Sequence, residues 1–320
     1  MEGIPELQNI VKLTARSDID SITQPKERRP METHSTPAFG LSLGYMLDAP
    51  SREIVEKLGE FGFTAGELNI RHLDFPESEL RILSDGLDRL TFHLPFDAQH
   101  RLVQPDPAQD AAVVEKLRAL ITRACELGVR TFVLHMMNLS GQRIEEYWDR
   151  SVQVARAVGQ IAREHDSVIG CENCYPVVRY GPVTERFLSE VDDPAVGMTL
   201  DTGHFWSAVI EDEFGHGKEW PLWNTTEGVS ELNALLYEMA RSVPHRITNI
   251  HIHNLRPSDW KDHQPVGEGI MEYDEFFEIL DDAGYDRTLM VEIRNPTGDW
   301  AAFESSARYL QQFMPETGRV

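Results

Sequence analysis

The chain has few cysteines, no long apolar run and no dense cluster of basic residues. Its three cysteines, Cys125, Cys171 and Cys174, are too few among 320 residues for a disulfide framework, and they indicate a reducing compartment. Cys171 and Cys174 form a Cys-x-x-Cys pair. A zinc site of this kind needs a second pair, so we expect a structural role for these cysteines.

Long hydrophobic segments are also missing. No apolar run approaches the roughly 18 residues that a membrane-spanning helix needs. Residues 1–16 lack the basic region, the continuous apolar core and the small-residue cleavage site of a signal peptide. We therefore predict a cytoplasmic protein without a membrane partner.

Basic residues are outnumbered by acidic ones. The chain contains 53 acidic and 30 basic residues, which gives a formal net charge of −23. This balance argues against broad binding to phosphate backbones, and we expect no nucleic-acid partner. The hydrophobic content of 41% is typical of a globular protein with a sizeable core.

Residues 1–37 differ in character from the rest of the chain. They are polar, contain Pro25, Pro30 and Pro37, and show no sustained hydrophobic period. We expect a flexible N-terminal tail, followed by a single domain over residues 38–320.

From residue 38 onward, short apolar runs alternate with longer amphipathic segments. The predicted strands are 39–44, 65–70, 90–94, 131–135, 168–172, 197–201, 247–253 and 288–292. The predicted helices include 51–61, 109–127, 143–165, 229–242, 272–283 and 298–313. Eight strands alternating with helices over about 280 residues predict an α/β fold, a closed (β/α)₈ TIM barrel. A doubly wound open sheet is less favoured, because no G-x-G-x-x-G follows the first strand.

The longest interval between strands contains an insertion at about 205–228, which would cover the barrel mouth. Within it, Trp206 could stack on a sugar face, although aromatic residues in long loops also serve to pack the loop down. Helix starts are predicted at Ser51 and at Asp110.

The ends of the predicted strands carry ionisable residues. In a (β/α)₈ barrel the functional face lies at the carboxyl ends of the strands. There the sequence supplies, in chain order, Glu67, His93, His135, Glu172, Asp201 with His204, His251 with His253, and Glu292. A single histidine at a strand end is usually a hydrogen-bonded core or rim residue. Seven consecutive strands with such groups instead indicate a site that binds metal or moves protons.

Three of these groups are carboxylates that would repel one another in one mouth. Glu172, Asp201 and Glu292 can all stay ionised there if a divalent cation lies between them. Carboxylates with imidazoles and without thiolate suit Mn²⁺, Zn²⁺, Co²⁺ or Mg²⁺. We expect Mn²⁺, with the other three as alternatives.

Residues 38–313 resemble the xylose-isomerase-like barrels, which include sugar isomerases and epimerases as well as apurinic endonucleases of the endonuclease IV type. The resemblance is carried by Glu172-Asn173, Asp201-Thr202-Gly203-His204, His251-Ile252-His253-Asn254, the segment His263-Gln264-Pro265-Val266-Gly267-Glu268-Gly269, and Glu292.

The resemblance implies a metal held by Glu172, Asp201, Glu292 and either His251 or His253. We favour His251, because Asn254 then takes a position where relatives often have aspartate. In the epimerase-like branch, the glutamates matching Glu172 and Glu292 are also the catalytic acid and base. They act on a ketose through a metal-stabilised enediolate, while His204 and Arg256 would contact substrate hydroxyls. The resemblance thus favours a metal-dependent sugar isomerase or epimerase.

The endonuclease-like branch is the alternative, a zinc phosphodiesterase that cleaves at abasic sites. His93, His135, His204 and His263 match ligands of its trinuclear zinc site. The aspartate expected two residues before His263 is Lys261 here, with Asp262 displaced by one, which weakens the third metal site. We therefore expect one metal, with these four histidines binding substrate.

Other features leave alternatives open. Glu67 could bind a substrate hydroxyl or pair with a neighbouring cation. A noncatalytic, metal-stabilised sugar-binding module is a third function that fits the same residues. The sequence leaves both the identity of the sugar and homo-oligomerisation open.

Overall fold

Eight strands alternate with helices in the computed structural model of the protein. The structure describes residues 36–96, 103–104, 106–135, 147–174, 181–204, 226–257, 261–294 and 299–314. The predicted tail, most of the predicted insertion and Trp206 lie outside these residues.

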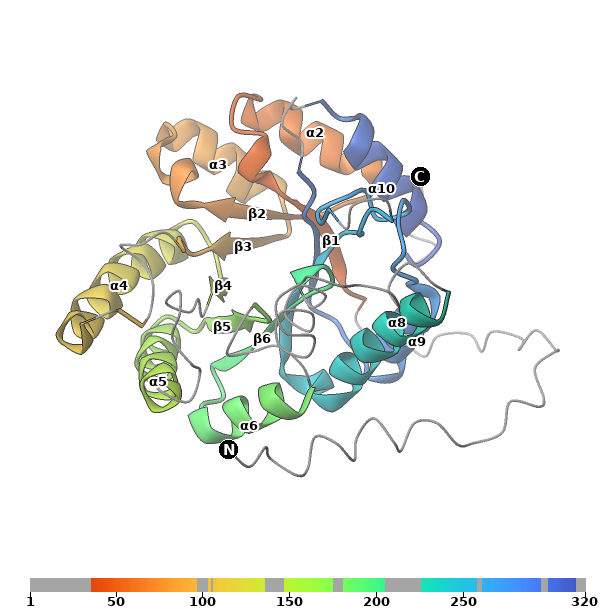
Figure 1. The fold of residues 1–320 in the computed structure, drawn as a ribbon. Coiled ribbons are helices and arrows are strands. Elements are labelled where there is room, and N and C mark those ends of the chain that lie inside the picture. The colour runs from red at the N-terminus through yellow and green to blue at the C-terminus, as the bar shows by residue number, and fades with distance from the viewer. Residues whose placement is uncertain are drawn as a thin grey trace. The chain divides into compact units, whose positions relative to one another are not determined.

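The strands form a closed barrel in which every neighbouring pair is parallel (Figure 1). Their bounds are β1 Ala38–Ser42, β2 Ala65–Asn69, β3 Arg89–His93, β4 Thr131–His135, β5 Val168–Glu172, β6 Val196–Asp201, β7 Ile247–Ile252 and β8 Thr288–Val291. The order follows the chain, and β8 closes the barrel against β1. The (β/α)₈ prediction is confirmed, with strand bounds within two residues of the expected ones.

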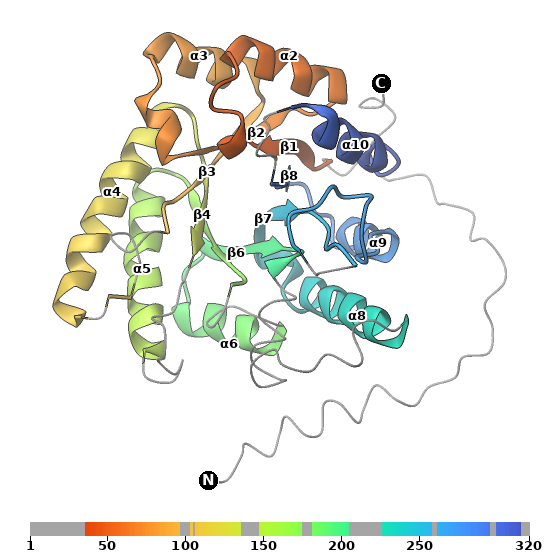
Figure 2. The same ribbon diagram turned by 45° about the horizontal axis from the view of Figure 1, so that its top comes forward.

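Helices surround the strands. They are α2 Ser51–Phe61, α3 Glu77–Gly86, α4 Asp110–Glu126, α5 Trp148–Glu164, α6 Gly181–Val191, α8 Thr226–Ser242, α9 Asp274–Asp282 and α10 Ala301–Leu310. The last helix, α10, packs beside the first, α2, so the ring of helices closes with the barrel (Figures 1 and 2). Within the described parts of the chain, no helix is both long and apolar enough to cross a membrane.

The predicted helix starts at Ser51 and Asp110 are confirmed. Helices α3 and α6 are not among the predicted helices. Helix α3 has ten residues and buries two of them, Leu80 and Leu83, too few for a clear period. Helix α6 begins with Gly181 and a proline, a pair that is typical of a turn.

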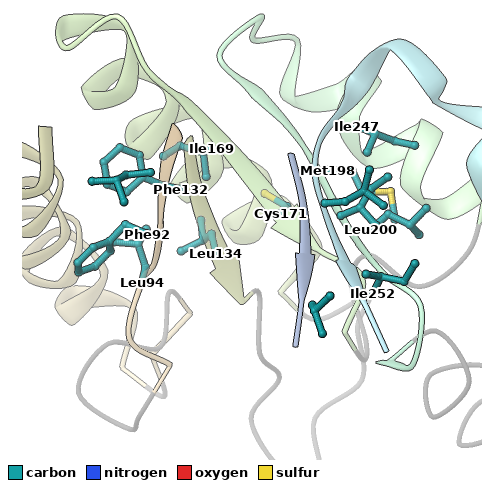
Figure 3. Packing of buried hydrophobic residues seen from close by; sticks show 14 of the residues in the cluster. Phe92, Leu94, Phe132, Leu134, Ile169, Cys171, Met198, Leu200, Ile247 and Ile252 are labelled. Carbon is teal, nitrogen blue, oxygen red and sulfur yellow. The ribbon is translucent and has the colours of Figure 1, made fainter. Parts of the chain in front are cut away.

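Side chains alternate along each strand between the helices and the barrel interior. Phe92 on β3 and Phe132 on β4 pack together in the apolar layer beneath the helices, with ring centroids 6.2 Å apart (Figure 3). Ile250 and Ile252 on β7 belong to the same layer. Because strand side chains have a period of two, His251 faces the opposite side, toward the interior.

The turn after β2 shows how local contacts shape the mouth. A 3₁₀ helix, η2, spans Ile70–Asp74 and is capped by Asn69, whose side chain accepts a hydrogen bond from Arg71 N. The backbone N–H of Asn69 donates to His72 Nδ1 at 3.0 Å, and the His72 side chain is fully buried. Burial lowers the pKa of His72 to about 4.

We expect stability to fall when His72 is protonated. Its pKa is lower in the folded chain than in the unfolded chain, so the unfolded state takes up the proton first as pH falls from 6.5 to about 4. The contribution of neutral His72 to the free energy of unfolding is complete above pH 6.5, and about 3 kcal/mol of it is lost by pH 4. His72→Leu should flatten this part of the pH profile, as measured by urea unfolding from pH 4 to 7. His245→Leu, at an exposed position, is the matched control, and equal profiles for wild type and His72→Leu would contradict the assignment.

Candidate metal centre

Four side chains from the ends of consecutive strands meet in the barrel mouth. They are Glu172 at the end of β5, Asp201 at the end of β6, His251 near the end of β7, and Glu292, which follows β8. Each offers a ligand atom, and these atoms all lie within 4.8 Å of one another. Glu172, Asp201 and His251 have no solvent exposure, and the Glu292 side chain is 16% exposed.

The imidazole of His251 faces all three carboxylates with one nitrogen. Its Nδ1 lies 2.9 Å from Glu292 Oε2, 3.5 Å from Glu172 Oε1 and 3.8 Å from Asp201 Oδ2. Neither His251 Nδ1 nor Glu292 Oε2 makes a hydrogen bond. The oxygens of all three carboxylates therefore gather around one imidazole nitrogen.

Glu172 is enclosed by three further histidines. His135 Nε2 lies 2.6 Å and His93 Nε2 3.6 Å from Oε2, while His204 Nδ1 lies 2.8 Å from Oε1. Despite these short distances, both oxygens of this buried carboxylate lack the geometry of a hydrogen bond. Buried polar atoms are rarely left unsatisfied, and a set of oxygen and nitrogen donors aimed at one point fits a divalent cation.

The carboxylates are held ionised. Burial alone would raise the pKa of Glu172, but the positive charges of His135 and His204 outweigh it and keep that pKa well below its usual range. Burial likewise opposes the ionisation of Glu292, where the charge of His251 lowers the pKa below its usual range. The site therefore presents negative oxygens to any cation that enters.

The histidines carry the compensating charge when no cation does. Burial alone would lower the pKa of His251, but Glu67 and the other carboxylates raise it well above its usual range. Asp201 and Glu172 raise the pKa of His204 to about 10 in the same way. Metal binding at these nitrogens would release their protons.

Asp201 is fixed by the backbone around it. Its Oδ1 accepts hydrogen bonds from Gly203 N, at 2.7 Å, and from His204 N. Asn173 bridges β5 and β6, because Asn173 Nδ2 donates to Asp201 O at 2.9 Å and Asp201 N donates to Asn173 Oδ1 at 2.6 Å. Asp201 Oδ2 faces His251 Nδ1 at 3.8 Å and also lies 3.2 Å from His253 Nε2.

The neighbouring His253 has no nitrogen left for that point. Its Nδ1 accepts a hydrogen bond from His263 N at 2.9 Å, so Nε2 carries the proton and faces Asp201 Oδ1 at 3.1 Å. The ring lies against Gly203, where a Cβ would come within 1.7 Å of it. This arrangement supports His251 over His253 as the ligand from β7.

A second group of donors lies beside the first. His204, Asp262 and His263 offer ligand atoms within 4.8 Å of one another, and Asp262 Oδ1 is 3.1 Å from His263 Nδ1. The sequence analysis predicted that the shift of the aspartate by one residue, to Asp262, weakens this site. In the structure Asp262 does reach the site, and Lys261 is exposed. His263 has a φ of 54°, which is uncommon for a residue other than glycine. Arg294 Nη2 lies 3.3 Å from the same Asp262 oxygen.

Glu67 departs from its expected place. It lies in the middle of β2, two residues before the strand ends at Asn69, and is 1% exposed. The sequence analysis grouped Glu67 with the strand ends although the predicted strand runs on to residue 70, and the structure places this side chain below the barrel mouth. Arg256 follows β7 and is partly exposed.

Two functional candidates were missed by sequence reasoning. Asn173 orients Asp201, as described above. Phe96 is 50% exposed and stacks on the His135 ring with centroids 4.5 Å apart and planes 16° apart. An aromatic residue three positions after the strand-end histidine His93 is the signal that could have found Phe96.

The family model described as xylose isomerase-like TIM barrel matches residues 55–313, well over half of the chain. The chain belongs to this family. An uncharacterized protein of Methanocaldococcus jannaschii is 25% identical over 287 residues, which cover 85% of this chain and 89% of the relative.

Solved structures share the barrel. D-psicose 3-epimerase from Clostridium cellulolyticum H10, solved with D-tagatose, superposes with a TM-score of 0.65 at 17% identity, covering 86% of this chain and 97% of its own. An L-ribulose 3-epimerase gives a TM-score of 0.65 at 17% identity, and the superposition covers 89% of this chain and 96% of the epimerase chain. At these sequence identities, the structural similarity shows a shared fold alone.

We expect this member of the xylose isomerase-like family to gain stability when Mn²⁺ is added after chelation. A ligand that binds only the folded state contributes about 2.7 kcal/mol at 100 times its Kd. Asp201→Asn should remove most of this gain, because it removes one of three converging carboxylates. Asp262 lies outside the four-ligand group, so Asp262→Asn should retain the gain in stability. Thermal unfolding with parallel metal analysis measures the effect, and an unchanged wild-type midpoint would contradict the metal centre.

Proposed function

We propose that the protein is a divalent-metal-dependent epimerase or isomerase of a sugar or sugar derivative that carries a carbonyl group. The observation that carries the proposal is the pair of ionised glutamates, Glu172 and Glu292, on the non-adjacent strand ends β5 and β8. They share one small space with Asp201 and His251. The names of the structurally similar 3-epimerases support a ketose as the substrate class.

The proposed ligands are Glu172, Asp201, His251 and Glu292, and Mn²⁺ suits their mixture of oxygen and nitrogen donors. When bound there, the cation would polarise the substrate's carbonyl oxygen and make the adjacent C–H more acidic.

The two glutamates would then exchange the proton. One carboxylate would accept the proton from the carbon next to the carbonyl, and the other would return to the opposite face a proton that it takes up from solvent. Their lowered pKa values mean that the proton-accepting form is present at neutral pH. Groups proposed to bind the substrate's hydroxyls are His93, His135, His204, His263 and Arg256, and Trp206 remains a predicted stacking residue.

We expect deuterium to enter the substrate at the carbon next to the carbonyl when ketoses are incubated in D₂O. Glu292→Gln should slow this exchange at least about 100-fold, because the amide cannot accept the proton. Glu304→Gln, on the exposed face of α10, should retain the wild-type rate. NMR of a panel of ketoses measures both rates, and neither exchange nor product across the panel would remove the basis of the isomerase proposal.

A zinc phosphodiesterase is the second candidate, favoured by the donor group of His204, Asp262 and His263 beside the first. Phosphodiester hydrolysis gains from two or three metals that hold the attacking and leaving oxygens. The second group has one carboxylate against three in the first, and Arg294 already pairs with that carboxylate. This charge balance makes the second group the weaker cation site.

We therefore expect about one tightly bound metal per chain after purification without chelators. His263→Ala should keep that metal, because His263 lies outside the four-ligand group. Elemental analysis gives the ratio. Three zinc ions per chain, together with cleavage of abasic DNA that His263→Ala abolishes, would favour the phosphodiesterase instead.

A further inference from the structure

A buried polar network lies inside the barrel, directly beneath the four proposed ligands. Its centre is Glu67 Oε2, which accepts a hydrogen bond from Thr91 Oγ1 at 2.9 Å and from Asn249 Nδ2 at 3.3 Å. The same oxygen lies 3.1 Å from His251 Nε2. None of these side chains is more than 1% exposed.

The contact between Glu67 and His251 crosses the barrel interior. Glu67 is on β2 and His251 on β7, and these strands are not neighbours in the sheet. The orientation of Asn249 is fixed from the other side, because Thr288 Oγ1 donates to Asn249 Oδ1 at 2.6 Å. The amide must therefore present its Nδ2 donor to the carboxylate.

We propose that Glu67 is a positioning residue that holds His251 in its metal-binding tautomer. A carboxylate can only accept, so the proton of the neutral imidazole lies on Nε2, where it donates to Glu67. The lone pair is then on Nδ1, which faces Glu172, Asp201 and Glu292. This inference rests on the proposed cation, and it gives Glu67 a role distinct from contact with substrate.

The chemistry of the network explains why a carboxylate is present at this depth. A buried carboxylate carries a desolvation cost, and Glu67 Oε1 has no hydrogen-bond partner to offset it. Glutamine would fill the same volume without a charge, and its amide oxygen would face Asn249 Nδ2, but a neutral amide oxygen is a weaker acceptor than a carboxylate and would hold the Nε2 proton less firmly. Such a carboxylate behind a ligating histidine fixes the ring and raises its basicity as a ligand.

The test is the metal affinity of Glu67→Gln, measured by competition with a chromophoric chelator for Mn²⁺ and Co²⁺. We expect affinity about 10- to 100-fold weaker than wild type, the range seen when such partners are removed. Glu67→Asp, which keeps the charge, should recover part of the loss. Thr91→Val is the matched control, because it removes one hydrogen bond to the same oxygen and leaves the carboxylate. It should lose less than about threefold.

Two further measurements separate positioning from packing. ¹⁵N NMR of the zinc-loaded protein should show the His251 proton on Nε2 in wild type and in Thr91→Val, and should show that proton in a weaker hydrogen bond in Glu67→Gln. Urea unfolding of the metal-free proteins should show that Glu67→Gln still unfolds in one cooperative transition, so that its loss of metal affinity does not reflect a loss of folding.

Wild-type affinity in Glu67→Gln, or an equal loss in Thr91→Val, would overturn the inference and leave the proposed function standing. A wild-type protein that binds no divalent cation would overturn the proposed metal centre and this inference with it. Metal binding that depends on Glu67, without turnover of any ketose, would support the positioning role and count against the epimerase.

Discussion

Three carboxylates, Glu172, Asp201 and Glu292, are brought into one small space because the strands that carry them converge at the barrel mouth. Their mutual repulsion in a buried site is the constraint around which the surrounding side chains are arranged. Without a metal, protonated histidines such as His204 and His251 compensate the charge. A bound cation would compensate the same negative charge, so the residues that stabilise the metal-free site are the ones that would bind the cation.

The barrel keeps apolar packing and charged groups on opposite sides of its strands. Alternation along each strand sends one set of side chains, such as Phe132 and Ile250, into the apolar layer beneath the helices. The other set faces the interior, where Glu67 and Asn249 form a polar network that continues up to His251. The charged mouth is thus supported from below by hydrogen bonds and held from outside by packing.

Sequence reasoning predicted the fold and most of the residues that meet in the candidate site for a simple reason. In a parallel barrel the strand ends all lie on one face, so residues at the strand ends are expected to be neighbours. Strand alternation alone could not choose between His251 and His253, because a period of two places both on the same side, and the preference for His251 came from the family resemblance. The partners of each nitrogen in the structure support that preference. Glu67 was grouped with the strand ends although it lies in the middle of its strand, and the reach of Asp262 was underestimated because the left-handed backbone at His263 is not visible as a sequence pattern.

The two donor groups differ in charge, and this difference bears on whether an epimerase or a phosphodiesterase is favoured. The first group combines three carboxylates with one imidazole, and its Asp201 is anchored by backbone N–H groups. The second combines one carboxylate with two imidazoles, and Arg294 already lies beside Asp262. Since Coulomb attraction grows with the charge of the ligand set, the two groups should fill at different metal concentrations. Imidazoles that are not needed as ligands would remain available to hydrogen-bond hydroxyl groups, and that supply of donors suits a polyhydroxylated substrate.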